Sequence, residues 1–415
     1  MNHMISIVTM RKYDNFFISF MTKKVILGLA LMLILIIPVT SLNASAQTSD
    51  KSYTLTGAGS TFVFPLMDTW RVEYNKIHQN IQLNYQSIGS GAGIKLLEQK
   101  SVDFAASDAP LSASDAKQAP GVLTIPESIG GITIAYNIPG MDKGLKLTGP
   151  VIAQIFMGNI TSWNDPAIAN LNPGTNLPAQ KIVIAHRSDG SGTTYAFTDY
   201  LSKISPDWKT KVGQGKTVPW PVGTGGNGNA GVANIVKTTP YALGYVELAY
   251  VFQNKMAYAF IQNADGNSFV EPTLETVAAD AASASGNLPA ADGDWSQVSI
   301  VNQPGSNSYP ISTLTYVMLY KDMSTVTGET QDKSTEVINF LSWVLHDGQQ
   351  YSSSLLYVPL PDSVKKIGED GLAKVTFTGS AVPEFGPIVV LVLAIAIVSI
   401  IAVSSKTGLR FSPKV

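Results

Sequence analysis

Four loops rich in glycine, serine and threonine carry the side chains whose types and spacing could do chemistry. They span residues 56–62, 88–93, 103–110 and 187–194. Together they supply one guanidinium group, several hydroxyl groups and, where a loop opens a helix, backbone N–H groups at the positive end of the helix dipole. A planar cation with hydroxyl and amide donors suits a tetrahedral oxyanion. Each loop alone is also compatible with an ordinary helix start, so the prediction depends on the set.

Two nucleotide-binding motifs are present only in part. Residues 223–228 fit the GxGxxG pattern and Glu247 follows about 20 residues later, but Trp220 and the proline after it make a poor preceding strand. Residues 215–217 resemble the end of a P-loop, yet the position of its first glycine is occupied by Thr210. Neither a dinucleotide site nor a P-loop is therefore expected.

Patterns for hydrolytic or metal chemistry are incomplete too. Ser191 lies in a Gly-Ser-Gly setting rather than the G-x-S-x-G of a nucleophile elbow, and His186 stands alone beside Arg187. The four histidines form no local pair at metal or triad spacing. The sequence therefore gives no local support to a hydrolase or a metalloenzyme, and no cofactor or metal is predicted.

The loops need strands and helices to hold their ends. Leu66, Trp70, Tyr74 and Ile77 recur at helical spacing, which predicts an amphipathic helix over 65–77. The expected strands are 53–55, 81–85 and 181–185, and a further helix follows the last of them. Across residues 47–376 such β-branched runs alternate with helical patterns. This order predicts an α/β fold with mainly parallel sheets.

Length and composition exclude other classes of protein. A chain of 415 residues is long enough for two or three compact units with a large core. The 28 Lys and Arg residues nearly balance the 30 Asp and Glu residues without forming a basic run, so nucleic acid is not an expected partner. Hydrophobic residues make up 45% and charged residues 14%, which excludes a disordered chain. Because the chain has no cysteine, disulfides and thiolate sites are excluded.

The first 46 residues have the order of a secretory signal. Lys23 and Lys24 precede an apolar run of 15 residues, 25–39, and small residues follow at 44–46. The run spans about 22 Å as a helix, which is shorter than the roughly 30 Å of a membrane core, so cleavage after residue 46 is favoured over a permanent span. Residues before Met21 are interpreted as an upstream extension or as the result of a misplaced start codon. Export from the cytoplasm is predicted.

The other end of the chain has the properties of a membrane span. Residues 385–403 form a run of 19 residues without charge, followed by Lys406 and Arg410. A buried core helix is the alternative, which the terminal position and the apolar character on every face disfavour. We predict a linker at 377–387, a transmembrane segment at 388–403 and a basic tail at 404–415.

The junction before that span resembles a sorting signal. Residues 382–386, VPEFG, resemble the PEFG-type C-terminal motif of archaeal surface proteins, in which a short motif precedes a hydrophobic span and a basic end. The resemblance implies an archaeal cell-surface protein whose tail is removed by a membrane peptidase of the archaeosortase type.

Taken together, the four loops resemble a known family of receptors. They read GAGSTF, IGSGAGIK, VDFAASDAPL and RSDGSGTTYAFTDYLSK, and in this order and spacing they resemble the phosphate-binding receptor, or substrate-binding protein, of the ABC-type high-affinity phosphate importer. The resemblance extends from about Leu55 to Asp362. It implies a type II periplasmic-binding-protein fold, in which two α/β lobes enclose a ligand cleft. We place lobe 1 at about 50–126 plus 301–376 and lobe 2 at about 127–300.

The resemblance also assigns ligand contacts. Carried over by position, the phosphate contacts fall on Thr61, the backbone amide of Phe62, Ser90, Asp108, Arg187, Ser191, Gly192 and Thr193. Asp189 is expected to orient Arg187 rather than to touch the ligand. The family pattern is altered at Val63, Ala92, Thr224 and Asn227. None of these changes removes a named donor, so they bear on affinity and importer docking more than on the class of ligand.

Asp108 carries the expected discrimination between anions. A carboxylate in an anion site is unfavourable unless the ligand brings a proton, and at neutral pH phosphate keeps at least one hydroxyl whereas sulfate has none. Asp108 would accept from that hydroxyl and would repel sulfate. Arg187 would provide the attraction through a two-point contact that a lysine cannot reproduce.

The predicted function is a non-catalytic receptor, held by its C-terminal segment on the outer side of the cell membrane, that binds inorganic phosphate and delivers it to the permease subunits of an ABC importer. The alternative is an enzyme or an adhesive surface protein on the same lobes, since a fold alone does not define a function.

Overall fold

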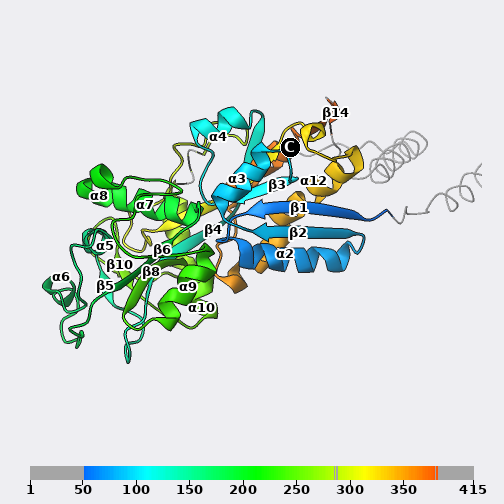
Figure 1. Ribbon diagram of the computed structural model, residues 1–415. Helices are drawn as coiled ribbons and strands as arrows, with labels where there is room; N and C mark the ends of the chain where they lie inside the picture. Colours follow the sequence, from blue (N-terminus) through cyan, green and yellow to red (C-terminus); the bar gives the residue numbers. More distant parts are fainter. Residues whose placement is uncertain (1–50, 285, 287, 379, 382–415) are drawn as a thin grey trace, which may run out of the picture. The chain divides into compact units, whose positions relative to one another are not determined.

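The computed structural model describes residues 51–284, 286, 288–378 and 380–381, in which strands and helices alternate along most of the chain (Figure 1). The chain divides into two units, Met1–Ser52 and Tyr53–Val415, and the elements below belong to the second. The strands are β1 (Tyr53–Gly59), β2 (Ile81–Ser87), β3 (Phe104–Ser107), β4 (Val122–Tyr136), β5 (Lys146–Leu147), β6 (Val183–Arg187), β7 (Thr224–Gly226), β8 (Ala242–Glu247), β9 (Ala257–Tyr258), β10 (Phe260–Gln262), β11 (Phe269–Val270), β12 (Ser312–Tyr320), β13 (Thr376–Phe377) and β14 (Ser380–Ala381).

The helices lie mostly between these strands. They are α2 (Phe64–Ile77), α3 (Ser90–Glu98), α4 (Ala113–Gln118), α5 (Gly149–Phe156), α6 (Pro166–Ala169), α7 (Gly192–Ile204), α8 (Pro206–Lys211), α9 (Gly228–Thr238), α10 (Leu248–Gln253), α11 (Leu274–Ala284), α12 (Gln331–Leu345) and α13 (Asp362–Leu372), with short 3-10 turns η2 (Met323–Thr325), η3 (Asp347–Tyr351) and η4 (Ser353–Leu355).

The helix predicted at 65–77 is confirmed as α2. It begins one residue earlier, carries a proline in its first turn, and buries Leu66, Trp70 and Tyr74. Ile77 is 62% exposed, although its spacing placed it on the same face, because the helix ends there. The indole nitrogen of the buried Trp70 donates to the carbonyl of Gly348 at 2.8 Å, so its polar atom is satisfied.

One strand belongs to both parts of the main sheet. Within the described residues this sheet has nine strands in the order β2-β1-β3-β12-β4-β8-β6-β7, with β9 also beside β4. Gly131 of β4 pairs with Ser312 of β12, but the next residue, Ile132, pairs with Glu247 of β8. We call the β1, β2, β3 and β12 side, with the first part of β4, the first half, and the β6 to β9 side the second half. The change of partner at 131–132 falls a few residues after the lobe boundary expected at 126–127.

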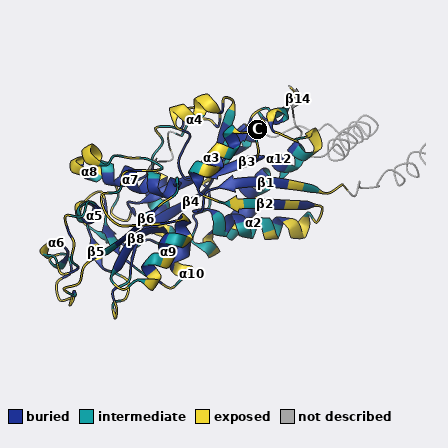
Figure 2. Cartoon of the chain, viewed as in Figure 1, coloured by how far each residue is buried: buried dark blue, intermediate teal, exposed yellow. Residues whose placement is uncertain are grey.

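Both halves bury their central strands on two faces. Every residue of β12 is buried, as is all of β4 except its first residue. Such continuous burial is typical of strands that are covered by helices on both sides. Figure 2 shows the dark, buried residues along the strands and the exposed residues on the outward faces of the helices. β2 alternates buried Ile81 and Leu83 with exposed residues, which suits its position at one edge of the sheet.

Parallel pairing brings the predicted loops to common edges. β1 runs parallel to β2 and β3, and β6 runs parallel to β7 and β8. Strands that run parallel end at the same edge of a sheet, where open α/β folds place their ligands. The loops after β1, β2 and β3 therefore share one edge, and those after β6, β7 and β8 share another.

The predicted terminal segments lie outside this description. The signal at 1–46, the transmembrane segment at 388–403, the basic tail and the PEFG motif fall on residues that the structure does not describe. Of the linker predicted at 377–387, residues 377–378 and 380–381 are described, and strand β14 and the end of β13 lie there. Among the residues that it does describe, no helix is both long and apolar enough to cross a membrane.

Candidate functional site

The predicted contact residues converge where the carboxyl edges of the two halves meet. All of the following side chains are at most 6% exposed: Thr61, Phe62, Ser90, Asp108, Arg187, Ser191 and Thr193. Hydrogen bonds join the halves directly at this point, from the amide of Asn229 to the hydroxyl of Thr61 at 3.1 Å and from the amide of Gly91 to the carbonyl of Gly190 at 2.8 Å.

Arg187 is a cation withdrawn from water. It is the last residue of β6, and its side chain is 1% exposed. Asp189 accepts from Nε at 2.7 Å and from Nη2 at 2.5 Å, so one edge of the guanidinium is held by a two-point pair. Burial raises the pKa of Asp189, but the hydrogen bonds and the charge of Arg187 lower it by more. The pKa of Asp189 is therefore below its ordinary value. Of the other guanidinium donors, Nη1 donates to Thr193 at 3.2 Å, so an anion at this nitrogen would share or replace that contact.

The hydroxyl of Thr193 connects three polar groups of the site. Its oxygen accepts from Nη1 of Arg187 at 3.2 Å and from Nδ2 of Asn229 at 3.1 Å. Its proton is donated to Oδ2 of Asp108 at 3.2 Å. Because Thr193 belongs to the second half and Asp108 follows β3 of the first, this bond also joins the two halves.

Asp108 is a buried carboxyl in which each oxygen already accepts one hydrogen bond. Ser60 donates its hydroxyl proton to Oδ1, and the backbone amide of Asp108 donates to Ser90 Oγ at 3.4 Å. Burial raises the pKa of Asp108 to about 6, although the hydrogen bond from Ser60 and the charge of Arg187 both lower it. At neutral pH the group is therefore mainly a carboxylate that titrates unusually close to neutrality.

A glycine is required where α7 begins. A Cβ atom at Gly192 would lie 2.6 Å from both the backbone nitrogen and Oδ2 of Asp108. Only a residue without a side chain lets the start of α7 approach the carboxyl of the other half so closely. Ser191 precedes it as the N-cap, and its hydroxyl accepts from the amide of Thr194 at 3.0 Å.

The first loop is held in place from several directions. The amide of Phe62, expected to face the ligand, donates to Ser60 Oγ at 3.0 Å in this structure. The carbonyl of Phe62 accepts from Tyr357 at 2.6 Å, and that of Thr61 accepts from Tyr250 at 2.7 Å. Phe62 itself is fully buried. The loop is thus anchored through its carbonyl groups.

Sequence reasoning missed two residues of this constellation. Ser60 lies inside the GAGSTF motif, directly before the residues that were assigned, and Asn229 lies just after the segment dismissed as a dinucleotide motif. Asn229 is fully buried, contacts Thr61 and Thr193, and accepts from the amide of Glu247 at 3.0 Å. The only signal in the sequence was the polar side chain itself in a glycine-rich loop, since its partners are far away along the chain.

Two further carboxyl groups are buried near Asp108. Thr315 donates to one oxygen of Glu127 at 3.0 Å, and the other oxygen has no hydrogen-bond partner within the described residues. Burial and, to a smaller extent, the charge of Asp108 raise the pKa of Glu127 to about 8, although the hydrogen bond from Thr315 lowers it. Burial likewise raises the pKa of Glu247 well above its ordinary value, although Glu247 accepts from two backbone amides at the start of α10.

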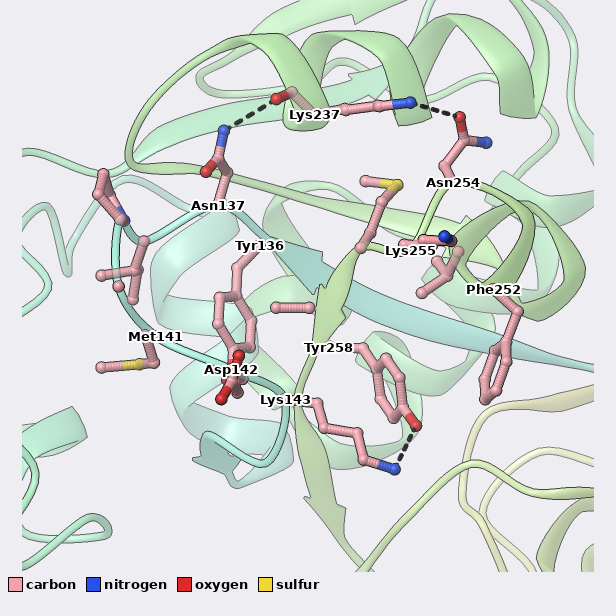
Figure 3. A pocket seen from close by; sticks show the side chains of 16 residues that line it. Tyr136, Asn137, Met141, Asp142, Lys143, Lys237, Phe252, Asn254, Lys255 and Tyr258 are labelled. Carbon is pink, nitrogen blue, oxygen red and sulfur yellow. Dashed lines mark hydrogen bonds between the residues drawn. The ribbon is translucent and has the colours of Figure 1, made fainter.

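A separate hollow lies beside the end of β4 in the second half. Its volume is about 800 Å³, and it lies between residues 137–143 and 251–258 (Figure 3). Lys237 donates to Asn254 at 3.2 Å and Lys143 donates to Tyr258 at 3.1 Å, as the dashed lines show. None of the predicted contact residues lines it. Among the described residues no group of His, Cys, Asp and Glu side chains is placed to hold a metal ion.

Comparison with known proteins first defines the class. A model of the PBP superfamily domain matches residues 44–347. Two solved structures share the fold. One is a high-affinity periplasmic phosphate-binding protein, PfluDING, with a TM-score of 0.60 and 17% identity, and the match covers 78% of this chain and 99% of that protein. The other is a phosphate-binding protein from Stenotrophomonas maltophilia with a TM-score of 0.59 and 18% identity, and the match covers 76% of this chain and 92% of that protein. The predicted two-lobed α/β binding-protein fold is confirmed.

Relatives by sequence then define the family. The phosphate-binding protein PstS of Xylella fastidiosa strain 9a5c is 44% identical over 322 residues, which cover 76% of this chain and 84% of the relative. PstS of Methanocaldococcus jannaschii is 37% identical over 371 residues, which cover 83% and 94%. The chain belongs to the PstS family of phosphate-binding proteins of ABC transport, and it is a binding protein rather than an enzyme.

We predict that stability becomes less sensitive to pH when Glu127 is replaced by Gln. The native state keeps its proton up to a pKa of about 8, whereas the unfolded chain loses it near 4.5. Across that window the unfolded state binds fewer protons, so the free energy of unfolding falls as the pH rises. In calorimetric melting without phosphate, the decrease in Tm between about pH 5 and pH 8 should be smaller for Glu127→Gln than for the parent.

The exposed Glu275→Gln is the matched control, since it makes the same chemical change at a carboxyl group that faces water. Equal pH slopes for Glu127→Gln and the parent would show that this carboxyl is not held protonated.

Proposed function

We propose that this chain is an extracytoplasmic, membrane-anchored receptor that binds inorganic phosphate and delivers it to the permease subunits of an ABC importer. The observation that carries the proposal is the buried guanidinium of Arg187 beside the carboxyl of Asp108, with Thr193 bridging them. A cation that faces a carboxylate suits an anion that carries both negative charge and a proton. Membership of the PstS family supports the same ligand.

The proposed contacts come from both halves. Thr61, the amide of Phe62, Ser90 and Asp108 belong to the first half, and Arg187, Ser191, Gly192 and Thr193 belong to the second. Phosphate would replace part of the direct hydrogen bonding now made between these groups. Asp189 is not a proposed ligand contact: it pairs with Arg187 and holds the guanidinium in one orientation.

Asp108 gives the proposed selectivity. Facing the hydroxyl of phosphate, its carboxylate accepts a hydrogen bond, whereas facing sulfate it meets an oxygen without a proton. The Ser60 and Thr193 hydroxyls already donate to Asp108, so its remaining electron pairs are directed by those two bonds.

The anchor is proposed on the sequence. The uncharged run 385–403, the VPEFG motif before it and the basic residues after it support a span that follows the folded domain and that an archaeosortase-type peptidase processes.

We predict that the parent binds phosphate stoichiometrically in titration calorimetry, without turnover, and that Arg187→Ala nearly abolishes the binding. The variant removes the one cation among the proposed contacts and leaves the ligand uncompensated, which should weaken binding by about 2–5 kcal/mol. Arg71→Ala is the control, because Arg71 forms a surface pair with Asp68 and should bind phosphate normally. Normal binding by a folded Arg187→Ala variant would disprove the site.

We predict that Asp108→Asn reduces selectivity more than affinity. The amide oxygen can still accept from Ser60 and from phosphate, while its NH₂ group can donate to an unprotonated sulfate oxygen. Phosphate affinity should change by less than about tenfold, whereas the preference over sulfate should fall by about tenfold or more in competitive calorimetry. In the parent the preference should also narrow below about pH 6, where Asp108 gains its own proton, and in the variant it should not. A preference unchanged by Asp108→Asn would contradict the role given to this carboxyl.

We predict that the full-length protein partitions with membranes and that a chain truncated after Ala381 is soluble. Truncation at this residue keeps the β13 and β14 hairpin, in which the amide of Thr378 donates to Asp322. Fractionation followed by mass spectrometry of the C-terminus measures both partition and processing. Full-length protein found only in the soluble fraction, with its tail intact, would disprove the anchor.

A further inference from the structure

An ion pair outside the contact residues joins the two halves. Lys216 Nζ lies 2.5 Å from Oδ2 of Asp115. Asp115 is on α4, between β3 and β4 of the first half, and Lys216 is in the loop between α8 and β7 of the second. Figure 1 shows α4 on the side of the first half that is nearest to α7 and α8.

Both partners are held in place by their own half. Asp115 forms a capping box with Ser112 at the start of α4, accepting from the backbone amide of Ser112 at 3.0 Å through the same oxygen that meets Lys216. The backbone carbonyl of Lys216 accepts from the amide of Ser191 at 2.8 Å. The lysine therefore starts from the loop that supports a proposed phosphate contact, while its side chain reaches the other half.

The pair is better shielded than an ordinary surface pair. Its side chains are 22% and 16% exposed, compared with 64% and 61% for Lys211 and Asp207 one turn apart on α8. Shielding from water strengthens the attraction between opposite charges. The pKa of Asp115 is lowered accordingly, because the hydrogen bond and charge of Lys216 outweigh the effect of burial.

Phosphate can enter and leave only if the halves separate. The proposed contacts Ser90, Asp108, Arg187 and Thr193 are at most 3% exposed. Separation must break the Thr61 to Asn229 and Asp108 to Thr193 bonds at the site, and it must also pull Lys216 away from Asp115.

We propose that Asp115 and Lys216 form a closing pair that stabilises the closed form and so sets how long phosphate stays bound. This proposal rests on the proposed function. The side chains of the closing pair bond to none of the proposed contact residues, so the pair acts on the equilibrium between open and closed forms and not on the choice of anion. The strength of the closing pair depends on both charges, so a change to either charge tests the proposal.

The test is the dissociation rate of phosphate from the full-length protein in detergent, measured by stopped flow with a fluorescent phosphate trap. Lys216→Gln and Asp115→Asn should each raise the rate about three- to tenfold and leave the association rate unchanged. Added salt should speed release from the parent and have little effect on the variants. The charge-reversed double variant, Asp115→Lys with Lys216→Asp, should return the rate toward that of the parent.

Matched controls distinguish the effect of the ion pair from the effects of net charge and of loop structure. Lys211→Gln and Asp207→Asn change the charge equally but break only the pair within α8, so they should release phosphate at the parent rate. If Lys216→Gln acted by disturbing the loop at Ser191, the phosphate-to-sulfate preference and the Tm of the phosphate-free protein would fall, and the double variant would show no recovery. That result, or release at the parent rate from both single variants, would overturn the proposal.

A second measurement keeps this result distinct from failure of the proposed function. The chain has no cysteine, so Asp115→Cys with Lys216→Cys provides the two thiols for a short bifunctional reagent. Cross-linking should be faster with phosphate than without it. If the parent bound no phosphate, the proposed function would fail, and cross-linking would still report whether the two positions meet; absence of cross-linking with and without phosphate would overturn the closing pair itself.

Discussion

Burial of the Arg187 guanidinium is the constraint on which the rest of the site depends. A charge withdrawn from water must be compensated by acceptors in fixed positions. Asp189 supplies two, and the same carboxylate accepts from the amide of Gly228 at 3.0 Å, so the start of α9 is positioned by the partner of the arginine. Asn229 follows at once and reaches Thr61 of the other half. One buried cation thus organises two loops of its own half and, through them, the contact with the opposite half.

Burial also affects which of the acidic side chains near the site carry a charge. Glu127 and Glu247 are buried close enough to Asp108 to interact with its charge, and three ionised carboxylates there would repel an anion. Burial raises the pKa of Glu127 to about 8, so this carboxyl is mainly protonated at neutral pH, and burial also raises the pKa of Glu247 well above its ordinary value. Asp108, with a pKa of about 6, remains mainly ionised at neutral pH. The field that an incoming anion meets is therefore set by protonation as much as by the positions of the groups.

The local elements could be predicted from sequence because their signals are local. The spacing of Leu66, Trp70 and Tyr74 gave α2, and the alternation at 81–85 gave β2. Strand β1 extends to Gly59, four residues beyond the predicted strand, because glycines that look like a loop can pair when the neighbouring strands cover them on both sides. The four loops were found because polar residues in glycine-rich turns stand out from the strands that precede them.

The remaining features depend on pairing across long separations. Nothing near Asn229 indicates that it will meet Thr61, and nothing near Glu127 indicates that its carboxyl will be enclosed, since both depend on which segments lie opposite one another. The insertion of β12 between β3 and β4 is the largest example. The strands that pair with β12 are about two hundred residues away along the chain, and no periodic pattern in the sequence indicates such a partner.

That insertion also affects when the chain can fold. β3 and β4 are not paired with each other, and β12, which starts at Ser312 of 415 residues, is the strand that joins them. A ribosome must therefore make about three quarters of the polypeptide before the first half can complete its sheet, and such distant pairing is slow even then. For the export proposed above, in which the chain would cross the membrane before it folds, late completion is an advantage. A translocation channel would then receive a polypeptide that has not yet closed its core, and no folded domain would have to be pulled apart at its entrance.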